Sequence, residues 1–256
     1  MTLRAVIITR SDPLFVPDYL GPVLANPAAK VEAIFIDQRQ SPFLSMADIV
    51  LMSSPLGFLR LAALKIASAT GLLGLFGFQG ERDIAALARA RGIPVEVVTS
   101  GREAALLERM RQIQPDVILS VANSHILPEP VLATARLCAL NSHGSLLPAY
   151  RGVLTGFWCL YNGEKKSGVT VHRMTSQIDG GDIYGQVEFD IPADETIFSY
   201  YRKVASYGGR LWADILEKLD RGDLVPRPNP PATQPMVKRP TRAEILGFRR
   251  RGKRFA

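Results

Sequence analysis

Short apolar runs alternate with amphipathic stretches along the first 140 residues of the chain. The runs have the length and composition of buried strands, and the stretches have the apolar spacing of helices. Strands are expected at Leu3–Thr9, Val31–Asp37, Ile93–Val98, Asp116–Ala122 and Leu137–Leu140, and helices at Glu81–Arg91, Arg102–Ile113 and Pro128–Ala135. This alternation predicts an α/β fold with a doubly wound, mostly parallel sheet.

The second half continues the pattern and then changes character. A helix is expected at Gly156–Tyr161, strands at Gly168–Met174 and Ile183–Ile191, and a long amphipathic helix at Glu195–Leu219. Five prolines between positions 226 and 235 predict an extended segment after it. We therefore expect one domain at residues 1–220 and a Pro-rich, basic C-terminal extension at residues 221–256, ending in a short extended tail.

An apolar insertion at about residues 43–78 interrupts the strand and helix pattern. Within it, Arg60 and Lys65 divide the apolar stretch into pieces shorter than the roughly 18–20 residues that a membrane span needs. We expect no transmembrane segment and a buried or interface-forming helix. Two alternatives are possible for the contact that residues 49–78 make: a homodimer interface or the surface of a membrane.

The net charge of +7 is carried by the C-terminal extension. From Lys238 to the end there are eight basic residues and one acidic residue, so residues 1–237 are neutral overall. A basic tail of this kind can attract phosphate groups. The high isoelectric point therefore describes the tail and not the fold.

The absence of certain motifs from the sequence argues against several classes of protein. Neither of the first two strands is followed by a glycine-rich phosphate loop, which argues against nucleotide hydrolysis and NAD chemistry. Cys138 and Cys159 have no disulfide or zinc spacing, and the N-terminus enters a strand pattern without a signal peptide. We expect reduced thiols, no metal and a cytoplasmic location.

The stretch Asn141–Gly152 follows the fifth expected strand, and its glycines and proline predict a loop. Ligands of open parallel sheets bind beyond the carboxyl ends of the strands. The loop would place a carboxamide (Asn141), an imidazole (His143), a hydroxyl (Ser145) and a guanidinium (Arg151) around such a crevice. Each of these residues alone is easily explained as a turn or surface residue, so the argument depends on the whole stretch.

Asn141, His143 and Asp179 together suit acyl transfer to an amine. An amide N–H can stabilise the oxyanion of a tetrahedral intermediate, and an imidazole can accept the proton of the attacking amine. A carboxylate such as Asp179 would orient the ring and raise the pKa of His143. The pair Gly180-Gly181 after it indicates a tight turn that permits close approach of a ligand to the backbone.

Three motifs resemble the folate-dependent formyltransferase family, which includes glycinamide ribonucleotide formyltransferases, methionyl-tRNA formyltransferases and sugar N-formyltransferases. The motifs occur in the family's order, and the resemblance covers residues 116–219 well. They are Asn141-x-His143-x-Ser145-Leu-Leu-Pro-x-Tyr150-Arg151-Gly152, Gly168-Val-Thr-Val-His172 and Ile178-Asp179-Gly180-Gly181. The segment Asn123–Pro128 fits the family's equivalent upstream segment. The resemblance implies a Rossmann-like formyltransferase fold.

The resemblance also implies roles for individual residues. Asn141, His143 and Asp179 would be catalytic, with 10-formyltetrahydrofolate as the formyl donor. The pterin would lie between two segments that supply Ser124, His125, Ile126, Leu127, Thr175, Ile178, Gly180 and Gly181. Ser145, Tyr150 and Arg151 are expected to contact the acceptor. His172 is expected to support the site without acting in catalysis, and Asp182 to be a solvated turn residue.

The chain departs from the family pattern at two places, and the second of them bears on the acceptor. Gly144 replaces a proline often found after the family's histidine, and the apolar insertion matches nothing in the family.

We expect a primary amine on a small molecule, such as a phosphorylated sugar, nucleotide or peptide precursor. A tRNA acceptor is disfavoured because only 36 residues follow Asp220, too few for an oligonucleotide-binding barrel. The motifs would also be compatible with hydrolysis of formyltetrahydrofolate, and less so with a non-catalytic binding protein built on an enzyme fold.

Overall fold

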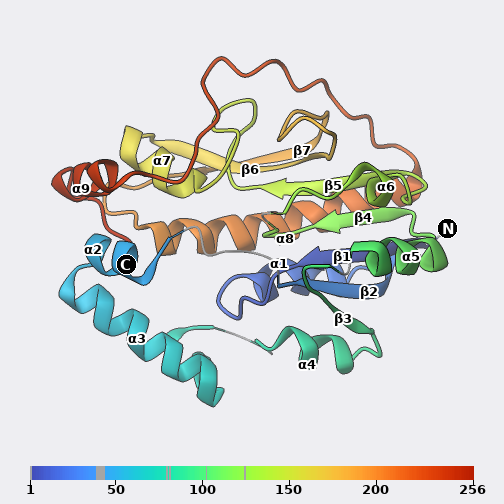
Figure 1. Cartoon of the computed structure of the whole chain (residues 1–256), viewed down its shortest axis with the longest axis horizontal. Helices are drawn as coiled ribbons and strands as arrows, with labels where there is room; N and C mark the ends of the chain where they lie inside the picture. The colour runs from blue at the N-terminus through green and yellow to red at the C-terminus, as the bar shows by residue number, and fades with distance from the viewer. Residues whose placement is uncertain (1, 39–43, 79, 81, 102, 124) are drawn as a thin grey trace.

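The computed structural model describes residues 2–38, 44–78, 80, 82–101, 103–123 and 125–256. Within these residues, seven strands form one sheet in the order β3-β2-β1-β4-β5-β6-β7, with helices on both faces (Figure 1). The strands are β1 (Leu3–Thr9), β2 (Ala29–Asp37), β3 (Val95–Val98), β4 (Val117–Ser120), β5 (Cys138–His143), β6 (Lys166–Arg173) and β7 (Ile183–Asp190).

The sheet is mostly parallel, which confirms the predicted fold class. Strands β1 to β5 pair in parallel, whereas β6 and β7 pair antiparallel to their neighbours. The chain first adds β2 and β3 on one side of β1 and then returns to place β4 on the other side. This reversal creates a crevice at the carboxyl ends of β1 and β4, where open α/β sheets bind ligands.

Both faces of the central strands are buried, as their uninterrupted apolar runs require. In β1, Ala5 and Ile7 belong to one hydrophobic cluster, whereas Val6 and Ile8 belong to a second cluster on the other face. The first cluster includes residues of α1 (Val16–Leu24), α4 (Ile84–Arg89), α7 (Thr155–Asn162) and α8 (Ile197–Arg221). The second includes residues of α5 (Glu103–Ile113) and α6 (Glu129–Leu132).

The long helix α8 fixes the position of α1 beside the crevice. Thr196 and Ser199 form a capping box at its start, and Gly222 ends it in the left-handed conformation. Gly208 allows close contact with α1, because a Cβ there would lie 2.2 Å from the ring of Tyr19. Helix α1 was not predicted, since Pro17 and Pro22 obscure its helical spacing.

The C-terminal extension differs from the predicted extended tail. After an exposed arch, residues 242–250 form helix α9 (Arg242–Arg250), which begins with a capping box of Thr241 and Glu244 (Figure 1). Its Phe248 is fully buried and stacks on Phe157 of α7, with ring centroids 4.7 Å apart. This helix was not predicted from the sequence, because most of its residues are polar or basic and only a few apolar side chains form its buried face.

The described part of the apolar insertion forms two helices and a short 3-10 turn. These are α2 (Met46–Met52), α3 (Pro55–Thr70) and η1 (Leu73–Phe76). One side of α3 packs on the protein through Leu64 and Ala67, whereas much of its remaining surface is exposed. Among the described residues, none of the helices has the length and apolar character needed to cross a membrane.

Candidate active site

A cavity of about 670 Å³ lies at the carboxyl ends of β1, β4 and β5. It brings together residues that are far apart in sequence, and its lining includes all three predicted catalytic residues. Asn141 and His143 enter it from β5, and Asp179 enters it from the loop between β6 and β7. The same cavity is bounded by residues before α1, in α8 and in the C-terminal extension.

Strand geometry explains how Asn141 and His143 come together. The structure places Asn141–His143 in β5 itself, so the predicted loop begins only after His143. Residues two apart in a strand project from the same side of the sheet. The register then pairs Asn141 with His172 of β6, and the Asn141 Nδ2 atom lies 3.3 Å from His172 Nε2.

The carboxylate of Asp179 lies between two histidines. Its Oδ2 atom is 3.5 Å from His143 Nδ1, and its Oδ1 atom is 3.4 Å from His172 Nε2. Oδ2 also accepts a hydrogen bond of 2.8 Å from the backbone N–H of Gly152. The backbone of Asp179 has a φ of +49°, an uncommon conformation that Asp tolerates better than most residues.

Hydrogen bonding determines which nitrogen of His143 can accept a proton. Nε2 lies 2.9 Å from the carbonyl oxygen of Tyr150, and a carbonyl can only accept, so Nε2 carries a hydrogen. In the neutral ring, Nδ1 is then unprotonated and faces Asp179. A proton taken up at Nδ1 would therefore be stabilised directly by the carboxylate.

Burial governs the charge states of this pair. Burial lowers the pKa of His143 below its usual value, although the charge of Asp179 opposes the shift. The expected effect of Asp179 is therefore present and has the predicted sign, but desolvation of the imidazolium outweighs it and the net pKa falls. For Asp179, burial alone would raise the pKa, but His143, His172 and the Gly152 N–H together lower it to about 2.

This arrangement suits an acyl transfer through a tetrahedral intermediate. A neutral imidazole can accept a proton, a carboxylate can stabilise the resulting cation, and the amide N–H of Asn141 can donate to an oxyanion. His172 contacts both Asn141 and Asp179, so it links the donor to the carboxylate. Its Nδ1 atom, 3.0 Å from the carbonyl oxygen of Arg173, holds the orientation of the ring.

The segments predicted to hold the pterin reach the cavity unevenly. His125, Ile126, Leu127, Thr175 and Ile178 all line it, whereas Ser124 lies outside the described residues. Gly180 and Gly181 do not line it. A Cβ at Gly181 would lie 2.2 Å from the Arg173 carbonyl oxygen, so this glycine permits close packing within the protein.

The three residues predicted to contact the acceptor instead have partners inside the protein. Ser145 is fully buried and donates to the carbonyl oxygen of Ala149. The Tyr150 hydroxyl donates to Glu164, and Arg151 Nη2 donates to the carbonyl oxygen of Pro230. None of the three lines the cavity. Turn geometry directs these side chains away from the cavity, a detail that the sequence pattern does not contain.

Several lining residues were missed by the sequence analysis. The C-terminal extension returns across the cavity, where the Val237 N–H donates to the Arg151 carbonyl oxygen and the Val237 carbonyl oxygen accepts from Val153. Gly152 makes this contact possible, because a Cβ there would lie 2.1 Å from the Val237 carbonyl oxygen. The lining residues that were missed come from the N-terminal part of the chain and from the C-terminal extension. They include Arg10, Phe15, Tyr19, Leu44, Ile49, Met236, Lys238, Arg239 and Phe255.

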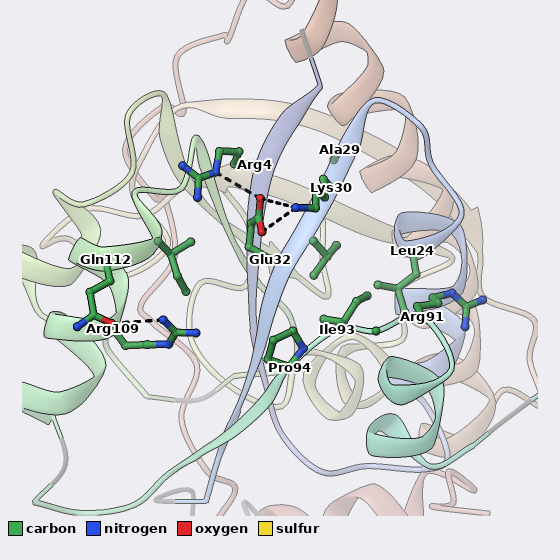
Figure 2. A pocket seen from close by; sticks show the side chains of 13 residues that line it. Arg4, Leu24, Ala29, Lys30, Glu32, Arg91, Ile93, Pro94, Arg109 and Gln112 are labelled. Carbon is green, nitrogen blue, oxygen red and sulfur yellow. Dashed lines mark hydrogen bonds and ion pairs between the residues drawn. The ribbon is translucent and has the colours of Figure 1, made fainter.

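A second hollow of about 610 Å³ lies at the opposite ends of the strands. Figure 2 shows it at the start of β1 and β2, where Glu32 forms ion pairs with Arg4 at 3.3 Å and Lys30 at 3.2 Å. Arg109, also in its lining, pairs with Glu96 at 2.7 Å. None of the predicted site residues lines this hollow. The arrangement of functional groups therefore points to the cavity at the carboxyl ends.

Comparisons with known proteins identify the family of the chain. The sequence model of a family described as formyl transferase matches residues 83–216, which is 134 of the 256 residues. A methionyl-tRNA formyltransferase of Citrifermentans bemidjiense is 37% identical over 140 residues. The match covers 55% of this chain and 44% of that protein, so the chain matches less than half of that relative's length.

Solved structures share the fold over most of the chain. A glycinamide ribonucleotide transformylase from Symbiobacterium toebii superposes with a TM-score of 0.62 at 19% identity, covering 90% of this chain and 95% of the other. The sugar 3N-formyl transferase WlaRD gives a TM-score of 0.59 at 16% identity, covering 93% of this chain and 70% of the other. At these identities the likeness establishes the shared fold.

Proposed function

Because this chain belongs to the formyl transferase family, we propose that it transfers a formyl group from 10-formyltetrahydrofolate to a primary amine of a small-molecule acceptor. The observation that carries this proposal is the meeting of Asn141, His143 and Asp179 in one cavity. In the proposed mechanism, Asn141 donates to the oxyanion and His143 accepts the proton of the amine. Asp179 then stabilises the imidazolium.

The cavity offers a suitable place for the pterin of the folate. Ile126 and Ile178 come from two separate segments, both line the cavity, and their side chains are 66% and 41% exposed. Apolar side chains left exposed in a cavity suit a flat aromatic ring. The WlaRD structure, determined in the presence of 5-N-formyl-THF, supports a folate for the family.

The acceptor side of the cavity combines cations with apolar side chains. Arg10, Lys238 and Arg239 supply positive charge, and Arg239 is paired with Asp48 at 2.9 Å. Phe15, Phe198 and other apolar side chains supply the rest of this region. We propose that the acceptor is an amine that also carries an anionic group, such as a phosphate. In this proposal, residues 1–220 hold the catalytic groups and residues 221–256 help to enclose the acceptor.

The function is tested by incubating the protein with 10-formyltetrahydrofolate and a panel of amines. Release of tetrahydrofolate that depends on an amine, together with a product about 28 Da heavier (the mass of a formyl group less one hydrogen), is the expected result. The variants Asn141→Ala and Asp179→Asn should both lose most of this activity. Formate released at the same rate with and without every amine would instead identify a formyltetrahydrofolate hydrolase.

A second candidate acceptor is an aminoacylated tRNA. It is favoured by the 37% identity to the Citrifermentans bemidjiense methionyl-tRNA formyltransferase over 140 residues. Competition between methionyl-tRNA and a small amine in the same assay separates the two. Formylation of methionyl-tRNA at submicromolar concentration, with no small amine accepted, would replace the small-molecule proposal.

A further inference from the structure

Large apolar side chains are exposed on α3 and in the segment that follows it. We call the side chains of Leu56, Leu59, Ile66, Leu72 and Leu75 the α3 stripe. Their exposed fractions lie between 53% and 80%. Helix α3 extends from the body of the molecule at the lower left of Figure 1. Large apolar side chains left exposed on one helix and on the turn after it indicate a contact surface.

The other side of α3 is anchored to the protein, so the stripe is held in a fixed direction. Leu64, Ala67, Leu73, Phe78 and Phe198 form a separate hydrophobic cluster beneath it. Phe198 also lines the active-site cavity. The cluster that contains Phe198 therefore lies between the α3 stripe and the cavity.

Positive charges border the α3 stripe on both sides. At about 100° per residue, Arg60 lies about 100° from Leu59 on one side, and Lys65 lies about 120° from it on the other. The segment between Ile49 and Gly80 contains no Asp or Glu. The C-terminal carboxylate of Ala256 packs at Gly57, which lies about 160° from Leu59 around the helix and so on the opposite side from the stripe. The exposed apolar face with its flanking cations therefore complements a surface that is apolar inside and anionic outside.

This charge pattern favours a lipid surface over a second copy of the chain. In a symmetric dimer through α3, Arg60 and Lys65 of both copies would meet without a carboxylate from the same segment. At a lipid surface, the phosphate groups pair with both cations, and the long aliphatic stems of Arg and Lys lie along the apolar boundary. Burial of apolar area at the headgroup boundary and attraction of cations to anionic lipids are the two contributions to binding at a membrane surface.

We propose that the α3 stripe binds the surface of an anionic lipid bilayer. The leucine and isoleucine side chains enter the boundary between headgroups and acyl chains, and Arg60 and Lys65 contact lipid phosphates. The stripe lies outside the described lining of the cavity, so the contact positions the enzyme without entering its active site. This inference is independent of the identity of the acceptor.

The test measures sedimentation of the full-length protein with vesicles of phosphatidylcholine containing phosphatidylglycerol, and with phosphatidylcholine vesicles alone. Wild type should bind the anionic vesicles more tightly. The double variant Leu59→Glu/Ile66→Glu should bind them at least about ten-fold less tightly, because both side chains would have to carry charge into the apolar boundary. A matched control, Val97→Glu/Val225→Glu, adds the same charge at exposed positions outside the stripe and should stay within about two-fold of wild type.

Three results would overturn the proposal. The first is that the wild-type protein does not bind anionic vesicles. The second is that Leu59→Glu/Ile66→Glu binds these vesicles as tightly as wild type. The third is a dimer in ultracentrifugation that this variant dissociates, since that would assign the stripe to a second copy. Formyl transfer to a water-soluble amine, measured without vesicles in every variant, should be unchanged. That readout separates failure of the lipid contact from failure of the proposed enzyme activity.

Discussion

His143 Nδ1 lies 3.5 Å from Oδ2 of Asp179, and the two side chains are only 5% and 10% exposed. Because Nε2 of the neutral ring carries its hydrogen toward the Tyr150 carbonyl oxygen, Nδ1 has no proton to share with the carboxylate. Because burial lowers the pKa of His143 and its neighbours lower that of Asp179 to about 2, the resting pair is a neutral imidazole beside a carboxylate. This is the state that a proton-accepting pair requires.

Replacing Asn141 by Ala should reduce turnover by about 10²–10³-fold, which is the range for loss of one oxyanion donor. Binding of folate should change much less, because the donor acts on charge that develops during the reaction. Single-turnover rates and equilibrium binding of folate measure the two effects separately. Asn162→Ala, whose side chain is exposed and contacts Tyr150 away from the cavity, serves as the control. Near-normal single-turnover rates in Asn141→Ala would remove the assigned role.

Replacing Asp179 by Asn should move the acidic limb of the pH–rate profile to lower pH. The rate requires neutral His143 and so rises with pH through the pKa of that residue, which burial lowers and Asp179 raises. Without the carboxylate the pKa falls further, and the maximal rate also falls because the imidazolium is less stable. Asp182→Asn, at an exposed position in the same loop, should leave the limb in place. An acidic limb that does not move in Asp179→Asn would show that the two residues are not coupled in the reaction.

Replacing Lys238 by Gln should raise the KM for an anionic amine several-fold and leave the KM for a neutral amine nearly unchanged. Lys238 is one of the residues that line the cavity, and its backbone carbonyl oxygen accepts a hydrogen bond of 2.8 Å from the Trp158 Nε1–H. The difference between the two amines should shrink as salt is added, because salt screens exposed charges. Steady-state kinetics at low and high ionic strength test this. Arg250→Gln, an exposed position outside the cavity lining, is the matched control, and an equal effect from it would assign the change to general charge.

Replacing Phe248 by Ala should lower the free energy of unfolding by about 3–5 kcal/mol, the usual cost of truncating a buried aromatic ring. Leu246→Ala in the same helix should cost less than about 1 kcal/mol, since Leu246 is 38% exposed. Urea denaturation of both variants gives the comparison. Removal of residues 238–256 should be more damaging still, because it exposes the core face that Ile245 and Phe248 cover. Equal stability of the two point variants would contradict the docking of α9.

The sequence was most informative where chemistry and periodicity coincide. Uninterrupted apolar runs predicted the parallel strands, and the Asn-x-His and Ile-Asp-Gly-Gly motifs predicted residues that lie together in the cavity. Prediction failed where position depends on contacts between distant segments. The directions of Ser145, Tyr150 and Arg151 follow from a turn that packs against the core and the C-terminal extension. The lowered pKa of His143 follows from burial, which a one-dimensional pattern does not contain.

The exposed arch between α8 and α9 determines how the chain can be divided. Residues 230–236 are exposed, whereas the helix beyond them is held by the buried ring of Phe248 and by the hydrogen bonds of Val237. Helix α9 thus binds the rest of the protein through its own contacts, and the exposed arch links it covalently. Two fragments produced by a break near Ala232 would retain the complementary surfaces needed to reassociate, at a cost set by the lost effective concentration of the tether. The extension is in this sense a covalently linked ligand of its own enzyme.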